Sequence, residues 1–386
     1  MKNDIVILGI RGIPASHGGF ETFAERLALF LVNRGWRVTV YCQGDSFVKE
    51  RNEDSWSGVY RVTLPVSRSG ALATIEFDWK CVTDVAARRP RTVLTLGYNT
   101  AAFSAWLRVK GIRNVINMDG LEWKRNKWRA HERVWLWINE RIGCLVGDLL
   151  VADHPEIARH LATRVSEKKI VTIPYGADRV EKADVSELRK YDLEPDRYAI
   201  VVARPEPENS ILEIVKAFSC RKRNVKLVVL GRYSVENPFQ SEVLNAASEE
   251  VLFPGAIYHR PTLDALRFYA RFYVHGHQVG GTNPSLVEAL GAGNAVLAHD
   301  NAFNRWVAGK SALFFRTIDG CEEHITALFE NDDAVRLMRQ EAVRRFQEGF
   351  GWEGLLKLYE HVLSGNTVAS FDCSVEKRDV NPVRNS

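Results

Sequence analysis

The stretch HGHQVGGTNPSLVEALGAG, residues His275–Gly293, contains the transition that indicates the fold. The apolar run Phe272–His275 leads into a turn with two adjacent glycines, Gly280 and Gly281, and a helical pattern follows directly. A buried strand, a glycine-rich turn and a helix, in that order, form the repeating unit of doubly wound α/β sheets. The rest of the chain should therefore repeat this unit.

The same alternation runs through both halves of the chain. Continuous apolar runs, typical of parallel strands buried on both faces, alternate with helical patterns. The expected strands are Asp4–Ile10, Arg37–Cys42, Thr92–Leu96, Asn114–Asn117, Leu149–Ala152, Tyr198–Ala203, Lys226–Leu230, Val251–Phe253, Phe272–His275 and Ala295–Ala298. The expected helices include Phe20–Asn33, Ile211–Ser219, Pro261–Tyr269 and Leu355–Leu363.

The alternation of strands and helices starts again after the turn-rich segment Pro174–Asp178, which indicates a domain boundary there. A chain of 386 residues is also too long for one ordinary hydrophobic core. We predict two Rossmann-like α/β domains, residues 1–178 and 179–363, whose loop edges face a shared cleft. The last helix is able to return to the N-terminal domain, and residues 364–386 form a polar tail.

The composition is that of a soluble globular protein. A net charge of +4 is too small to indicate a nucleic-acid or membrane partner by itself. No run approaches the roughly 18 apolar residues of a membrane span, and the N-terminus lacks a signal-peptide pattern, so we expect a cytoplasmic protein. The six cysteines are scattered without a CxxC pair, which predicts reduced thiols and no metal site.

The segment Gly280–Glu288 has the features of a site for an anion. Paired glycines let a backbone approach a phosphate closely, and free N–H groups at a helix start favour negative charge. Glu288 lies one turn into the helix, where its carboxylate can accept hydrogen bonds from both hydroxyls of a ribose. Three polar side chains add partners in the same turn: Thr282, Asn283 and Ser285. The alternative is an ordinary capped turn in which Glu288 complements the helix dipole.

A second candidate segment, Val201–Phe218 (VVARPEPENSILEIVKAF), contains a strand that ends in Arg204. An arginine at the carboxyl end of a strand lies at the mouth of the expected cleft, where its guanidinium suits a diphosphate. The alternative is a surface arginine paired with Glu206 or Glu208.

The loop Gly12–Glu21 (GIPASHGGFE) joins the first strand to the first helix, and Gly18 and Gly19 precede the helix start. A dinucleotide site would need the spacing GxGxxG here and an acidic residue after the second strand. That strand ends in Cys42–Gln43 instead, so a nicotinamide cofactor is disfavoured.

Taken together, these segments resemble the retaining GT-B glycosyltransferases of family 4, and most closely their rhamnosyltransferase-like subgroup. The resemblance spans roughly residues 4–363. It is carried by LGIRGIPASHGGFETFAERL (Leu8–Leu27), NMDGLEWKRNKW (Asn117–Trp128), ARPEPEN (Ala203–Asn209) and HGHQVGGTNPSLVEAL (His275–Leu290).

The resemblance implies a C-terminal domain that binds a nucleotide-sugar donor and an N-terminal domain that binds the acceptor. It implies that Arg204 and the Gly280–Gly281 backbone bind the diphosphate, and that Glu288 contacts the ribose or another part of the donor. It also brings Gly18 and Gly19 near the donor phosphates. No metal or other cofactor is implied, since the nucleotide sugar is itself a substrate.

Three positions depart from the wider family pattern. Gly280 stands where the first glutamate of a donor-binding pair is usual, and Asn209 stands where a diphosphate-binding lysine is usual. Asp119 replaces a histidine of the N-terminal domain. The resemblance therefore implies a variant site in which Arg204 is the clearly placed cation.

Asp119 and Glu122, in the segment Asp119–Trp123 (DGLEW), follow a strand and can project into the cleft. Either can orient or deprotonate an acceptor hydroxyl. The alternative is that Asp119 forms a turn before Gly120. Retaining transfer in this fold is commonly pictured as front-face attack, in which the leaving phosphate helps take the proton and Arg204 stabilises it.

The stretch Trp123–Arg141 (WKRNKWRAHERVWLWINER) mixes tryptophans with basic residues. This composition suits an anionic membrane surface, where lipid-linked acceptors are found. The alternative is a helix with Trp135 and Trp137 in the core and solvated basic residues. Nothing resembles a nucleic-acid module.

The sequence thus predicts retaining transfer of a hexosyl or deoxyhexosyl unit, rhamnosyl by the subgroup resemblance, to a saccharide acceptor. The acceptor is expected to be lipid-linked, in surface polysaccharide biosynthesis, with the enzyme cytoplasmic or peripheral at the inner face of the membrane. The alternatives are a nucleotide-sugar 2-epimerase, which can use the same two-domain fold, and a non-catalytic nucleotide-sugar-binding protein.

Overall fold

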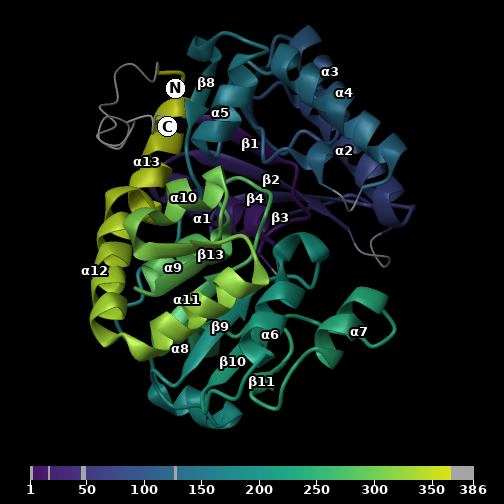
Figure 1. Cartoon of the computed structure of the whole chain (residues 1–386). Helices are drawn as coiled ribbons and strands as arrows, with labels where there is room; N and C mark the ends of the chain where they lie inside the picture. Colours follow the sequence, from purple (N-terminus) through teal and green to yellow (C-terminus); the bar gives the residue numbers. More distant parts are fainter. Residues whose placement is uncertain (1–2, 16–17, 45–48, 126–127, 367–386) are drawn as a thin grey trace.

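The computed structural model describes residues 3–15, 18–44, 49–125 and 128–366, which form two α/β lobes (Figure 1). The N-terminal lobe is built on an eight-stranded sheet in the order β3-β4-β2-β1-β5-β6-β7-β8. The C-terminal lobe has a six-stranded sheet in the order β11-β10-β9-β12-β13-β14. Within the described residues the strands pair in parallel except β3 with β4, which agrees with the α/β fold class predicted.

The first sheet consists of β1 (Asp4–Leu8), β2 (Arg37–Gln43), β3 (Asn52–Trp56), β4 (Val59–Leu64), β5 (Thr92–Leu96), β6 (Arg113–Asn117), β7 (Leu149–Ala152) and β8 (Ile170–Thr172). Its helices are α1 (Gly19–Asn33), α2 (Gly70–Arg88), α3 (Ser104–Val109), α4 (Ala130–Val146) and α5 (Pro155–Ala162). Single 3-10 turns, η1 (Ala101–Phe103), η2 (Glu122–Lys124) and η3 (Glu167–Lys169), complete the lobe.

The second sheet consists of β9 (Tyr198–Val202), β10 (Lys226–Leu230), β11 (Val251–Leu252), β12 (Phe272–His275), β13 (Ala295–His299) and β14 (Ala312–Phe315). Its helices are α6 (Ile211–Ser219), α7 (Pro238–Asn245), α8 (Arg260–Phe268), α9 (Pro284–Gly291), α10 (Ala302–Ala308), α11 (Ile318–Glu330) and α12 (Asp332–Gly349). The 3-10 segments η4 (Val185–Tyr191), η5 (Pro207–Asn209) and η6 (Gly309–Ser311) lie between them.

All the strands and helices named from the sequence are present, with ends that differ by a few residues at most. The sequence did not predict the hairpin β3–β4, the edge strands β8 and β14, or the helices α10 to α12. The hairpin gives the first sheet its one antiparallel pairing among the described strands.

The strands are buried because helices cover both faces of each sheet, which is why their sequences read as continuous apolar runs. Side chains of β1 that point to one face join a core with α1, whereas those that point to the other face pack against α2. In the C-terminal lobe α6 and α11 cover one face, and α9 and α12 cover the other.

The last helix, α13 (Trp352–Leu363), leaves the C-terminal lobe and packs against α1 of the N-terminal lobe (Figure 1). The rings of Tyr359 and Phe23 have centroids 4.6 Å apart. The indole of Trp36 donates to Glu360 (3.1 Å), and Asn117 donates its amide to the Tyr359 hydroxyl (3.0 Å). The N-terminal core is therefore completed by the C-terminal end of the described chain.

The chain thus passes between the lobes twice, and the two passages lie side by side. The amide of Ala177 donates to the carbonyl of Phe350 (2.9 Å), and Ala177 forms a parallel bridge with Gly351. The loops at the carboxyl ends of the two sheets meet away from this crossing, at the contacts described next.

Candidate active site

The glycine-rich turn before α9 has the geometry of a capped helix start. Asn283 is the N-cap, and its side chain accepts from the backbone N–H of Ser285 (3.1 Å). The Ser285 hydroxyl donates to the same Asn283 oxygen (2.8 Å) and accepts from Tyr273 (2.9 Å). Gly280 has φ of 144°, which a residue with a side chain rarely adopts. The predicted polar side chains thus shape the turn, and its first N–H groups are those of Gly281 and Thr282.

Gly281 is required for the approach of a residue from the other lobe. A Cβ atom at this position would lie 2.1 Å from an Asp153 carboxylate oxygen. The backbone N–H of Thr282 donates to Asp153 Oδ2 (2.9 Å), and the Thr282 hydroxyl donates to the Asp153 carbonyl. The glycines predicted to admit a phosphate therefore also let the N-terminal lobe reach the turn.

Two more glycines lie at the same meeting point. A Cβ atom on Gly120 would lie 3.5 Å from the carbonyl carbon of Gly280, and one on Gly19 would lie 3.4 Å from a ring carbon of Pro284. Gly18, with φ of 104°, is the N-cap of α1. The structure thus brings the first loop of the N-terminal lobe to the start of α9.

Glu288 forms an ion pair with Arg267 of α8 (2.5 Å). The Arg267 side chain is almost fully buried, and its Nε and Nη1 atoms have no hydrogen-bond partner among the described residues. A buried guanidinium of this kind holds the carboxylate in place through a charge-assisted hydrogen bond. Glu288 is one turn into α9, as predicted.

Arg204 follows β9 and its side chain is exposed. The amide of Asn209 donates to its carbonyl (2.8 Å), so Asn209 shapes this loop. Neither predicted ion-pair partner binds Arg204: Glu208 pairs with Arg125 instead, and no ion pair joins Arg204 to a described residue. Burial, together with the charges of Arg125 and Arg204, lowers the pKa of His277 to about 3, so this imidazole is neutral beside the two cations.

Arg125 connects the lobes. Its guanidinium binds Glu208 of the C-terminal lobe and Glu122 of its own lobe (2.8 Å). Glu122 also accepts from the indole of Trp128 (3.2 Å). The Glu122 side chain is therefore engaged in holding this junction.

Asp119 takes the turn conformation that the sequence offered as an alternative, with φ of 50°. Its backbone N–H donates a hydrogen bond to the side-chain oxygen of Asn117 (2.9 Å). Asp119 also lines a cavity, so the turn does not remove it from the site.

This cavity, of about 230 Å³, lies in the N-terminal lobe. Its walls include the strand ends Leu8–Arg11 and Thr95–Gly97, Asp119, and Asp78 of α2. Burial raises the pKa of Asp78 to about 6, although a hydrogen bond from the Thr100 hydroxyl (2.7 Å) opposes the rise. Together with Glu21, which also lines the cavity, three carboxyl groups thus face a space large enough for a sugar ring.

The sequence did not predict the positions of three polar residues in or near this candidate site: Asp78, Asp153 and His277. Asp78 is an acid on the apolar face of α2, next to Phe77 and one turn before Val82, and that pattern was a detectable signal. Asp153 follows a strand directly, as Asp119 nearly does. His277 lies in the segment His275–Gly293, but one of the two arginines near it, Arg125, comes from the other lobe.

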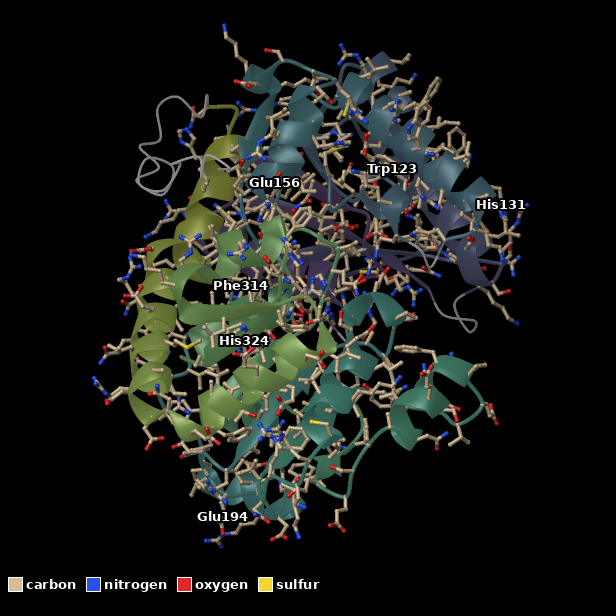
Figure 2. The ribbon with its side chains drawn as sticks, viewed as in Figure 1. Trp123, His131, Glu156, Glu194, Phe314 and His324 are labelled. Atoms are coloured by element: carbon tan, nitrogen blue, oxygen red, sulfur yellow. The ribbon has the colours of Figure 1, made fainter. Side chains whose placement is uncertain are left out.

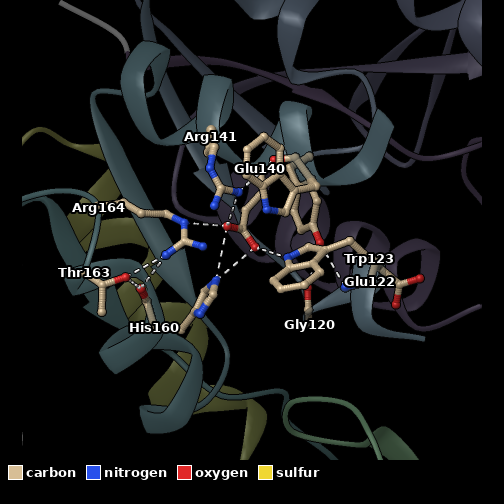
Figure 3. A network of polar contacts seen from close by, with 10 residues as sticks. Gly120, Glu122, Trp123, Glu140, Arg141, His160, Thr163 and Arg164 are labelled. Atoms are coloured by element: carbon tan, nitrogen blue, oxygen red, sulfur yellow. Dashed lines mark hydrogen bonds and ion pairs between the residues drawn. The ribbon is translucent and has the colours of Figure 1, made fainter. Parts of the chain in front are cut away.

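The segment Trp123–Arg141, apart from residues 126–127, which lie outside the described residues, forms η2 and most of α4. Trp123 donates its indole N–H to the buried carboxylate of Glu140 (2.6 Å), which also contacts His160 (3.1 Å) and Arg164 (2.7 Å) (Figure 3). Although burial opposes it, these hydrogen bonds and charges lower the pKa of Glu140. Trp123 is thus tied to the lobe interior.

Trp135 and Trp137 are each 41% exposed, so the expectation that they lie in the core is wrong. The reason is the phase of α4: Leu136, Asn139, Glu140 and Gly143 take its buried face. No helix in the described part of the chain is long and apolar enough to cross a membrane. The described residues also contain no group of three metal-binding side chains.

Known proteins were compared with the chain by sequence and by structure. Residues 2–178 match the family model described as "Domain of unknown function (DUF1972)". No curated protein matched the sequence. A sucrose-phosphate synthase from Thermosynechococcus elongatus has a similar structure, with a TM-score of 0.79 and 16% identity over 95% of this chain and 100% of that one.

Two further structures are similar over their whole length. Anabaena HepE in complex with UDP and glucose has a TM-score of 0.73 and 13% identity, covering 94% of this chain and 100% of that one. An α,α-trehalose-phosphate synthase from Burkholderia xenovorans, in complex with glucose-6-phosphate, has a TM-score of 0.72 and 13% identity, covering 95% and 100%. The chain has the GT-B fold. Identities this low establish the fold alone.

Proposed function

We propose that this chain is a retaining glycosyltransferase that moves a sugar from a nucleotide-diphosphate donor to a saccharide acceptor. The observation that carries the proposal is the junction where the Gly280–Thr282 turn and the start of α9 meet the N-terminal lobe at Gly19, Gly120 and Asp153. A helix start favours the negative charge of a diphosphate. HepE, which shares the fold, was solved in complex with UDP and glucose, the two parts of a nucleotide-sugar donor, and this supports the proposal.

On this proposal the C-terminal lobe binds the donor. Arg204, exposed at the end of β9 without an ion pair among the described residues, stabilises the leaving diphosphate. Glu288, fixed by Arg267, accepts from the ribose hydroxyls. The family resemblance favours a rhamnosyl or other hexosyl unit on dTDP, UDP or GDP, and front-face transfer with retention.

The acceptor sugar would enter the cavity of the N-terminal lobe. Asp119 lines this cavity and directly precedes Gly120, where a Cβ atom would lie 3.5 Å from the carbonyl carbon of Gly280. Asp78 and Thr100 lie in its wall and can bind hydroxyls. The attacking hydroxyl is then held between Asp119 and the donor, and the leaving phosphate receives its proton.

A nucleotide panel tests the proposal directly. Thermal unfolding is measured with UDP, GDP, dTDP and their sugars, since a ligand that binds the folded protein at 100 times its Kd stabilises it by about 2.7 kcal/mol. Nucleoside diphosphate should then be released only when an acceptor is added. Conversion of the donor sugar without an acceptor would instead indicate the epimerase alternative, and binding without turnover a non-catalytic protein.

We further propose that the acceptor is lipid-linked, as in surface polysaccharide biosynthesis, and that the protein meets the inner face of the membrane through α2, α3 and α4. The three helices lie side by side on one side of the N-terminal lobe (Figure 1). Their large exposed apolar side chains, here called the α2–α4 face, are Leu72, Trp79, Trp106, Val109, Val134, Trp135, Trp137, Ile138 and Leu145.

Basic groups lie among these apolar side chains. Lys110 lies 4.9 Å above the Trp106 ring and Arg141 lies 3.3 Å above the Trp137 ring. Figure 2 shows His131, near the start of α4, at the outer edge of the lobe. Apolar and basic groups in one surface suit the interface of an anionic bilayer.

Vesicle binding tests the α2–α4 face. We expect Val109→Asp/Leu145→Asp, which changes side chains that are 73% and 66% exposed, to weaken binding to vesicles with anionic phospholipid at least tenfold. Each lost apolar contact is worth roughly 1–2 kcal/mol. The matched control is Val235→Asp/Leu337→Asp, at 75% and 54% exposure in the C-terminal lobe, which should bind as the wild type does.

Binding should also weaken as salt is added, because the basic groups act through screened charges. Equal binding by the two double variants would contradict the proposed membrane face. Loss of a concentration-dependent dimer in Val109→Asp/Leu145→Asp alone would show that a second copy covers it instead.

A further inference from the structure

Asp153 is an acid of the N-terminal lobe that lies inside the donor turn of the C-terminal lobe. It follows β7 directly, and its Oδ2 atom accepts the N–H of Thr282 (2.9 Å). The Thr282 hydroxyl donates to its carbonyl. Its second oxygen, Oδ1, is shielded from solvent and has no hydrogen-bond partner among the described residues. A Cβ atom on Gly281 would lie 2.1 Å from that oxygen, so Oδ1 faces the glycine turn.

The surroundings of Asp153 keep its proton in place. Burial, and then the negative charge of Asp119, raise its pKa to about 8, against a weaker opposing effect of the Thr282 N–H. Tyr359 of α13 also faces it, and burial, followed by the charge of Asp153, raises the pKa of this tyrosine. Since Oδ2 accepts a hydrogen bond, a proton on this carboxyl group would lie on Oδ1, which has no hydrogen-bond partner among the described residues.

We propose that Asp153 is a donor-binding residue supplied by the N-terminal lobe, and that its Oδ1 hydroxyl donates a hydrogen bond to a diphosphate oxygen of a nucleotide sugar at the Gly280–Thr282 turn. This inference rests on the proposed function. The start of α9 attracts an anion, and an ionised carboxylate at this point would repel it. A neutral carboxyl group can instead donate its O–H to a phosphate oxygen, so that both groups have a hydrogen-bond partner.

The proposal makes donor binding a proton-linked event. Only the protonated form of Asp153 can donate, so the affinity should fall as the pH rises past about 8. The bound diphosphate adds negative charge beside Asp153 and raises its pKa further, so binding takes up a proton near that pH. A nucleotide sugar is esterified at both ends of its diphosphate, and the ligand's phosphates therefore do not titrate in this range.

Calorimetric titration of the full chain with UDP-glucose and dTDP-rhamnose measures this linkage. Two buffers with different protonation enthalpies report the protons taken up at each pH. We expect about 0.5 proton per donor at pH 8 and close to none at pH 6, and an affinity about tenfold lower at pH 9 than at pH 7.

Asp153→Asn is the matched variant, because its amide can accept from Thr282 with one atom and donate into the turn with the other. It should bind the donor within about threefold of the wild type at pH 7, with no proton uptake and no loss at pH 9. Asp153→Leu, which has a similar shape without a donor, should lose at least tenfold in affinity. Circular dichroism checks that both variants are folded.

The outcomes separate the two ideas. If UDP-glucose or dTDP-rhamnose binds with the same pH dependence in the wild type and in Asp153→Asn, the role of Asp153 is wrong and the proposed function stands. If neither these donors nor UDP, GDP and dTDP bind the wild type at any pH, both proposals fail.

Discussion

Arg204→Ala is expected to lower the rate of sugar transfer by about 10²–10³-fold while leaving the fold intact. The guanidinium is exposed at the end of β9 and forms no ion pair with a described residue, so its loss removes no packing or buried hydrogen bond. Its proposed work is to stabilise negative charge that develops on the leaving diphosphate, and that charge is larger in the transition state than in the bound donor. The effect should therefore fall mainly on kcat.

Steady-state kinetics with the donor found in the nucleotide panel give the measurement. Arg204→Lys should recover part of the rate, since an ammonium supplies charge without a two-pronged contact. Arg189→Ala, an exposed arginine of η4, is the control for the loss of one cation. An unchanged kcat in Arg204→Ala would remove this residue from the catalytic machinery.

Asp153→Asn is expected to make the ligand-free protein more stable at neutral and alkaline pH, by on the order of a few kcal/mol. In the unfolded chain Asp153 ionises near pH 4, whereas in the folded protein it keeps its proton up to about pH 8. Between these values folding takes up a proton, so the free energy of unfolding of the wild type falls as the pH rises. Asparagine does not titrate, so the free energy of unfolding of the variant does not fall with pH for this reason.

Unfolding midpoints measured from pH 4 to pH 9 test this. The difference between Asp153→Asn and the wild type should be near zero at pH 4, grow up to about pH 8 and stay constant above it. Asp319→Asn, an exposed aspartate of α11, controls for the loss of one carboxyl group. A difference that does not change with pH would mean that Asp153 is ionised in the folded protein.

Much of the fold was predictable because parallel strands buried on both faces produce unmistakable apolar runs. The run YAIVVA became β9 and KLVVL became β10, with ends within a residue or so. The hairpin was not predictable in the same way. β3 has the sequence NEDSW and lies at the edge of the sheet. Its residues are mostly polar, and they form a strand only because they pair with β4.

The candidate site was predictable to the extent that it is local in sequence. The glycine turn, its N-cap Asn283 and the position of Glu288 on α9 follow from neighbouring residues. The partners of these groups come from elsewhere. Arg267 reaches Glu288 from α8, and Asp153 reaches Thr282 from the other lobe. No local pattern contains such pairings, and the paired glycines gave no sign that a carboxyl group would lie against them.

The course of the last helix has a consequence for the order in which the protein folds. Residues 2–178, the part that matches the family model, contain every strand of the first sheet, but α13 is made after the C-terminal lobe and covers Phe23 and its neighbours on α1. While the ribosome is still producing the C-terminal lobe, this apolar side of α1 stays open to water. The N-terminal lobe therefore completes its core only after α13 has been synthesised, and the two lobes mature together rather than one after the other.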